Sequence, residues 1–157
     1  MDYYIREINE NEYGILEDFL YEAIFIPEGA AAPPREIIYR PELQVYIEGF
    51  GKKAGDMALV AQADNKIVGA VWVRIMNDYG HIDNDTPSFA ISLYNEYRNK
   101  GIGTALMVSM LDKIKQAGYR QASLAVQKEN YAVNMYKKVG FEIAYENDEE
   151  YIMLCKF

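Results

Sequence analysis

LYNEYRNKGIGTAL, residues 93–106, is the segment that determines the fold of this chain. An apolar run ending at Leu93 is typical of a strand, and it leads into a basic turn that carries two glycines. From Ile102 onward, apolar residues recur every four positions, which predicts a helix over residues 100–116. The first backbone amides of a helix have no acceptors within it, and the helix dipole adds positive charge there. The segment therefore predicts an anion site at the start of a helix.

The composition of the turn makes phosphate the favoured anion. Gly101 and Gly103 lack the Cβ atoms that would keep a phosphate away from the backbone, and Arg98 and Lys100 add positive charge. The segment is not a Walker A loop, because no Gly-Lys-Ser/Thr follows at the required spacing. The dinucleotide-binding fingerprint is also incomplete, since Leu106 stands where a third small residue is expected.

The rest of the chain predicts one α/β domain over residues 1–157, with a mixed central sheet of about seven strands and helices on both faces. A turn at Asp64-Asn65 predicts a hairpin. Strands are expected over residues 4–8, 57–61, 67–74, 89–93, 122–126, 141–145 and 151–155. Helices are expected between Asn9 and Pro27, from Pro41, and over residues 100–116 and 131–138.

The composition restricts the possible partners. The formal net charge of −8 argues against nucleic acid, whose phosphates require a surplus of basic residues. The negative charge favours a cationic partner such as an amine. The alternative is that the charge only keeps the protein soluble. No apolar run reaches the length of about 20 residues that spans a bilayer, so no membrane association is expected.

Single histidine and cysteine residues limit metal and redox chemistry. His81 and Cys155 cannot together form a zinc site of the usual kind, so no metal is expected. One cysteine cannot form an internal disulfide, and residues 1–7 lack the features of a signal peptide. A cytoplasmic location is therefore expected.

Two separated motifs resemble those of the GNAT superfamily of N-acetyltransferases. Residues 97–103, YRNKGIG, are similar to its Arg/Gln-x-x-Gly-x-Gly/Ala signature. A second signature follows at the expected distance, and the resemblance spans roughly residues 60–157. The matching residues of the second signature are Val126, Asn130, Ala132, Tyr136, Gly140 and Phe141.

The resemblance implies a GNAT-like fold and acetyl-CoA as co-substrate. It implies that backbone amides of the turn bind the CoA pyrophosphate, that Leu93 and Tyr94 pair with the pantetheine amides, and that Asn130 hydrogen-bonds the pantetheine arm. The pyrophosphate-binding residues would be Arg98, Asn99, Lys100, Gly101, Ile102, Gly103 and Thr104.

Tyr136 is the implied general acid, which would protonate the departing thiolate. A tyrosine with a pKa near 10 keeps its proton at neutral pH and can donate it. The alternative is that Tyr136 only packs in the core, like many of the fourteen tyrosines.

The acceptor side is less clearly encoded. A carboxylate, a histidine or ordered water must remove a proton from an alkylammonium before it can attack a thioester. Glu28 and Asp83 are the preferred substrate contacts. The full set of candidates is Glu22, Glu28, His81, Asp83 and Asp85.

The favoured function is transfer of an acetyl group from acetyl-CoA to a primary amine, of a small molecule or a peptide, by direct attack. One alternative is a GNAT-fold module that binds acyl-CoA as a sensor or regulatory partner without turnover. A nucleotide-phosphate binder is a third, but it leaves the second motif unexplained. The sequence leaves open whether the chain forms a homodimer.

Overall fold

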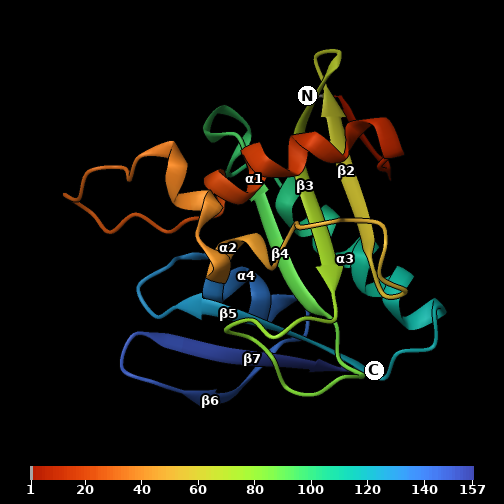
Figure 1. Ribbon diagram of the computed structural model, residues 1–157, viewed down its shortest axis with the longest axis vertical. Helices are drawn as coiled ribbons and strands as arrows, with labels where there is room; N and C mark the ends of the chain where they lie inside the picture. Colours follow the sequence, from red (N-terminus) through yellow and green to blue (C-terminus); the bar gives the residue numbers. More distant parts are fainter. Residues whose placement is uncertain (1) are drawn as a thin grey trace.

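The computed structural model describes residues 2–157 and contains a mixed sheet with helices on both faces (Figure 1). In the described residues the sheet has seven strands in the order β1-β2-β3-β4-β5-β7-β6, which confirms the predicted fold class. The strands are β1 (Tyr3–Glu7), β2 (Met57–Ala63), β3 (Lys66–Arg74), β4 (Ser88–Leu93), β5 (Gln121–Gln127), β6 (Glu142–Glu146) and β7 (Glu150–Lys156).

The helices cover the two faces of the sheet separately. The elements α1 and α2 lie on one face, and α3 and α4 lie on the other (Figure 1). The α-helices are α1 (Leu16–Glu22), α2 (Pro41–Gln44), α3 (Ile102–Gln116) and α4 (Ala132–Lys138), and the 3₁₀ helices are η1 (Glu10–Ile15), η2 (Arg35–Tyr39) and η3 (Asn95–Tyr97). No helix in residues 2–157 is both long and apolar enough to cross a bilayer.

The two-residue period of the central strands builds a core on each face. On β3, Val71 and Val73 pack with α3, whereas Ala70 and Trp72 pack with α1. Both faces of β3 are therefore buried, which explains its nearly continuous apolar sequence. Trp72 is fully buried and belongs to the core.

Two predicted helices begin or end elsewhere in the structure. The first helical segment starts as η1, which contains Gly14, and only its second half is an α-helix. The long helix begins at Ile102, two residues later than predicted, because Asn99 and Gly101 have positive φ angles of 61° and 86°. Left-handed residues cannot belong to a right-handed helix, so the turn extends to Gly101.

A buried ion pair anchors the segment between α2 and β2. The guanidinium of Arg74, at the end of β3, donates to both carboxylate oxygens of Asp56 at 3.0 and 2.8 Å. It also donates to the carbonyl oxygens of Val45 and Glu48 at 3.1 and 2.8 Å. Because the pair is fully hydrogen-bonded, its desolvation is compensated only while both partners are present.

The strands β4 and β5 pair over a short distance and then separate. In residues 2–157 their parallel pairing is confined to Ser88 and Ser123, and the Ser123 amide donates to the Pro87 carbonyl at 2.9 Å. Toward Leu93 the two strands diverge (Figure 1). The sheet is therefore open between the C-terminal halves of β4 and β5.

We expect Asp56→Ala to lower the free energy of unfolding by about 3–5 kcal/mol, because it leaves the Arg74 charge buried and unpaired. Urea denaturation of the purified variant measures the loss. Asp18→Ala is the matched control, since Asp18 pairs with Arg35 at the surface and should cost less than about 1 kcal/mol. Equal losses in the two variants would show that the buried pair has no special role.

Candidate active site

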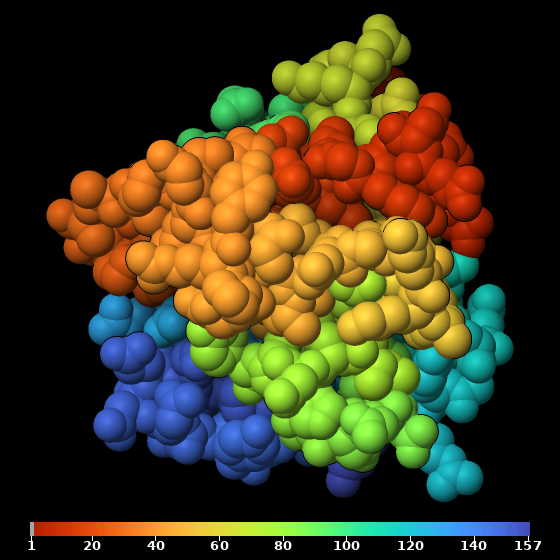
Figure 2. Space-filling model, in the orientation of Figure 1, coloured from red at the N-terminus to blue at the C-terminus, as the bar shows by residue number. Residues whose placement is uncertain are grey.

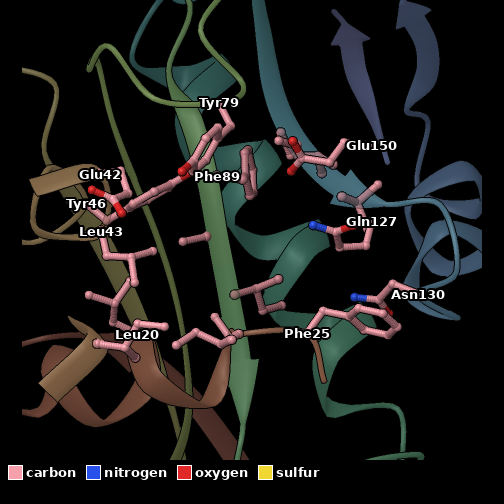
Figure 3. Close-up of a pocket in the computed structure, with 18 of the residues that line it drawn as sticks. Leu20, Phe25, Glu42, Leu43, Tyr46, Tyr79, Phe89, Gln127, Asn130 and Glu150 are labelled. Atoms are coloured by element: carbon pink, nitrogen blue, oxygen red, sulfur yellow. The ribbon is translucent and has the colours of Figure 1, made fainter. Parts of the chain in front are cut away.

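A cleft of about 360 Å³ lies where β4 and β5 separate. The segment around η2 and α2 covers it from the side of α1; in Figure 2 this segment runs in orange across the middle of the visible face. The apolar wall includes Leu20, Ile24, Phe25, Ile37, Leu43, Phe89 and Ile91. The polar lining includes Arg40, Glu42, Tyr46, Tyr79, Gln127, Asn130, Tyr136 and Glu150, all of which except Arg40 and Tyr136 are labelled in Figure 3.

The N-terminus of α3 presents backbone amides that the helix itself does not use. Ala105 is the residue whose amide bonds back to the Gly101 carbonyl, at 3.1 Å, so the amides of Ile102, Gly103 and Thr104 precede the helical bonding pattern. In the described residues no side chain caps this terminus. The structure therefore keeps the predicted anion site available, with the exposed Lys100 beside it.

Arg98 has a different position from the one that the sequence suggested. Its backbone amide already donates to the Asn95 carbonyl at 3.2 Å, so it is not part of the unused set. Its side chain donates to the Leu93 carbonyl at 3.0 Å and to the Glu22 carboxylate at 3.2 Å. Arg98 thus joins the end of β4 to the end of α1, and Glu22 is the partner of that cation.

The backbone of Leu93 faces the gap, whereas that of Tyr94 does not. The Tyr94 amide donates to the Val68 carbonyl at 3.0 Å, and its carbonyl accepts from the Tyr97 amide at 2.9 Å. Both groups that were expected to pair with a ligand are therefore already bonded. Because amide directions alternate along a strand, the Leu93 amide points away from β3 and toward the gap.

Glycine is required at the two positions of the turn for different structural reasons. Gly101 adopts a left-handed conformation, with no atom within 4 Å of where a Cβ would lie. At Gly103 a Cβ would lie 3.3 Å from Cδ1 of Leu93 and 3.4 Å from Sδ of Met135. Gly103 thus allows α3 to pack closely against β4 and α4, which differs from the predicted role of giving a phosphate direct access.

Asn130 lies at the cleft with its amide group oriented by a helix cap. Its Oδ1 accepts from the Ala132 amide at 2.9 Å at the start of α4. That bond assigns the oxygen to the helix, so the NH₂ group is directed into the cleft (Figure 3). A hydrogen-bond donor is therefore available there.

Tyr136, on α4, has a hydroxyl group that opens onto the same cleft. Its side chain is 9% exposed and packs edge-on against Phe141, with ring centroids 6.2 Å apart. Within residues 2–157 the hydroxyl has no hydrogen-bond partner, and no side-chain polar atom is both sealed from solvent and unpaired. Burial raises the pKa of Tyr136 to about 12, so the hydroxyl stays protonated at neutral pH.

The preferred acceptor contacts, Glu28 and Asp83, do not line the cleft. Glu28 is exposed in the loop after α1. Asp83 accepts from the Thr86 hydroxyl at 2.7 Å and from the Asp85 amide at 2.8 Å, and the Thr86 bond lowers the Asp83 pKa. His81 is bonded to the Met76 carbonyl at 2.8 Å within the same loop.

Glu42 and Glu150 are the carboxylates that line the cleft, and sequence reasoning missed both. Glu42 comes from the first turn of α2, and Glu150 opens β7 opposite Gln127 of β5. Their positions depend on how α2 packs over the sheet and on the insertion of β7 beside β5. Among the described residues, no group of three or more His, Cys, Asp or Glu side chains is placed to hold a metal ion.

The chain belongs to the acetyltransferase (GNAT) family, whose model matches residues 19–141. N-acetyltransferase 8B of Homo sapiens is 25% identical over 108 residues, which cover 68% of this chain and 48% of that protein. The N-alpha-acetyltransferase of Sulfurisphaera tokodaii is 30% identical over 92 residues, which cover 53% of this chain and 54% of that protein. The chain therefore spans about half the length of these curated relatives.

Solved structures share the fold over the whole chain. The PaiA N-acetyltransferase from Thermoplasma acidophilum, solved in complex with coenzyme A, is 21% identical and has a TM-score of 0.73, with complete coverage of both chains. A GNAT-family acetyltransferase from Streptococcus pneumoniae is also 21% identical, with a TM-score of 0.70 and coverage of 99% of this chain and 100% of that one.

We expect the Tyr136 hydroxyl to remain protonated at pH 10.5, because its burial opposes the charged phenolate. Carbon-13 NMR of ring-labelled tyrosine measures this, with the Tyr136 resonance assigned by its loss in Tyr136→Phe. A Tyr136 signal that titrates with a midpoint near 10 would contradict the buried environment described above.

Proposed function

We propose that this protein transfers an acetyl group from acetyl-CoA to a primary amine. The observation that carries the proposal is the arrangement of three features: the uncapped N-terminus of α3 beside the end of β4, the gap between β4 and β5, and Tyr136 in the cleft at that gap. Membership of the GNAT family makes acetyl-CoA the donor that best fits these features.

The donor half of the proposed site consists mainly of backbone groups. The CoA pyrophosphate would bind the amides at the start of α3, where the helix dipole and Lys100 favour a doubly charged anion. The extended pantetheine arm would enter the gap between β4 and β5. There it would meet the Leu93 amide, as an added strand meets a sheet edge, and the amide group of Asn130.

The chemical step would be direct attack of a neutral amine on the thioester carbonyl. A backbone amide of β4 near Leu93 would stabilise the oxyanion. Tyr136 would donate a hydrogen bond to the sulfur as the carbon–sulfur bond breaks. With a pKa of about 12, its hydroxyl is a weaker acid than an ordinary thiol of pKa ~8.5. We therefore expect the proton that ends on sulfur to derive from the amine. Tyr136 would stabilise and orient the departing sulfur through its hydrogen bond.

The acceptor half favours an amine that is cationic in solution and partly apolar. Among the described residues, Glu42 and Glu150 place two carboxylates on the lining of the cleft, against the one cation Arg40, and the rest of the wall is largely aliphatic and aromatic. A net charge of −8 would also steer a cation toward the protein. Both a small alkylamine and the N-terminus of a peptide satisfy these conditions.

The direct test is a thiol-release assay with acetyl-CoA across polyamines, aminoglycosides, amino acids and peptides. We expect at least one amine to stimulate release. Tyr136→Phe should lower the turnover number by about 10²-fold, with little change in acetyl-CoA binding, because the hydrogen bond is needed only as charge develops. Acetyl-CoA binding without release in any amine would favour the non-catalytic module instead. Unchanged turnover in Tyr136→Phe would return Tyr136 to a packing role.

Gly103→Val should weaken CoA binding at least about tenfold, or roughly 1.4 kcal/mol. The valine would displace Leu93 and Met135 and so move the start of α3 away from the end of β4. Calorimetric titration with CoA measures the change, and circular dichroism checks that the fold is kept. Gly14→Val is the control, since Gly14 has open space around it in η1. Unchanged affinity in Gly103→Val would contradict the assigned donor site.

A further inference from the structure

A hydrogen-bonded tyrosine–aspartate pair extends from the cleft into the protein. The Tyr46 hydroxyl donates to Oδ2 of Asp78 at 2.9 Å. Tyr46 follows α2 and lines the cleft (Figure 3), whereas Asp78 lies in the loop between β3 and β4 and is not among the lining residues. The carboxylate is therefore connected to the cleft through the phenol.

Surrounding groups hold both members of the pair in place. Oδ1 of Asp78 accepts from the Ser88 hydroxyl at 3.0 Å, and Ser88 in turn contacts the Ser123 hydroxyl at 3.2 Å. The buried indole of Trp72 donates to the Tyr46 carbonyl at 3.1 Å. The pair is thus supported by side chains of β3, β4 and β5.

We propose that Tyr46 and Asp78 form a proton relay that deprotonates the acceptor amine, an inference that rests on the proposed function. As the ammonium N–H proton moves to the oxygen of Tyr46, the phenolic proton of Tyr46 moves to Oδ2 of Asp78. The amine becomes neutral, Tyr46 ends neutral, and Asp78 carries the proton. The amine then attacks the thioester and loses a second proton, which ends on the thiol. Asp78 returns its proton to solvent, so the balance is one proton released for each acetyl group transferred.

The surroundings of the pair suit this role. Burial raises the pKa of the Asp78 carboxyl, although the hydrogen bonds from Tyr46 and Ser88 oppose the rise. This makes Asp78 a better proton acceptor than an exposed aspartate. Burial and the neighbouring Asp78 charge raise the pKa of Tyr46, so the phenol transmits a proton without ionising. The other titratable groups near the pair are Tyr79 and His81 on the same loop and Glu150 from β7.

In residues 2–157 the carboxylates of Glu42 and Glu150, unlike the Tyr46–Asp78 pair, are not held in place by hydrogen bonds. Both belong to the cleft lining, and within the described residues neither carboxylate forms an ion pair or accepts a hydrogen bond, although the Glu150 amide donates to Asn147 Oδ1 at 2.7 Å. They suit electrostatic attraction of the ammonium. A base must instead be held in a fixed position relative to the proton that it removes, and the Tyr46–Asp78 pair is held in that way.

The test compares two acceptors that differ in the need for a base. The first is the best alkylamine from the panel, and the second is its fluorinated analogue, whose ammonium is largely deprotonated at pH 7. We expect Asp78→Asn and Tyr46→Phe each to lower kcat/KM for the alkylamine by about 10²-fold, but to lower it less than ~3-fold for the analogue. For each acceptor, kcat/KM of the variant is divided by that of the wild type, so the lower nucleophilicity of the analogue cancels. The double variant should be no worse than either single variant, since both break the same relay.

The controls separate the relay from simple positioning. Tyr39→Phe removes a hydroxyl from an exposed tyrosine outside the cleft lining and should leave both rates unchanged. The same loss for both acceptors, or no loss in Tyr46→Phe, would overturn the relay while leaving acetyl transfer by the wild type intact. A wild type that acetylates no amine would overturn the proposed function as well. If Asp78→Asn does not fold, Tyr46→Phe alone decides, because it keeps the bond between Asp78 and Ser88.

Discussion

The separation of β4 from β5 is the constraint on which the rest of the site depends. Ser88 and Ser123 close one end of this strand pair, and Ser123 also donates to the Gly80 carbonyl at 2.6 Å. A Cβ at Gly80 would lie only 3.0 Å from the backbone of Leu124 and Ala125, so the loop between β3 and β4 rests directly on β5. The closed end is therefore fixed by close contacts, and the strands diverge away from it toward the N-terminus of α3.

The gap leaves backbone hydrogen-bonding groups of β4 without a neighbouring strand. Such groups are costly to bury unpaired, so water or an extended ligand must satisfy them. A ligand that carries its own amides can do so without any particular side chain. This explains how the proposed donor half can rest on the geometry of Leu93 and of the first turn of α3, with Arg98 fixing the end of β4 to α1.

The helix start on which the proposed donor half depends could be predicted from the sequence because its signals are local. Periodic apolar residues after Gly101 identify a helix start, and a helix start has unused amides wherever it occurs. The hydrogen bonding and packing of individual residues in this segment were less predictable. The engagement of the Tyr94 amide depends on pairing with β3, and the closeness of Gly103 to Met135 depends on how α3 meets α4. No local pattern encodes either contact.

The residues of the proposed acceptor half could not be predicted because separate elements bring them together. Glu42, Asp78 and Glu150 are far apart in sequence, and each looks like an ordinary surface carboxylate in its local context. Glu28 and Asp83 looked equally suitable by that criterion, yet Asp83 is occupied within its own loop. Only the packing of α2 across the sheet and the place of β7 beside β5 distinguish these carboxylates.

The two cores on opposite faces of the sheet have a consequence for how the protein can diverge. The first turn of α3 is anchored in the core that α3 and α4 share, whereas Glu42 and Tyr46 project from the α2 segment on the other face. Substitutions in that segment can reshape the cleft while the packing of α3 against β4 stays the same. A duplicated copy of such a chain could therefore change the shape and charge of this cleft through changes confined to the η2–α2 segment, the loop after β3 and the start of β7.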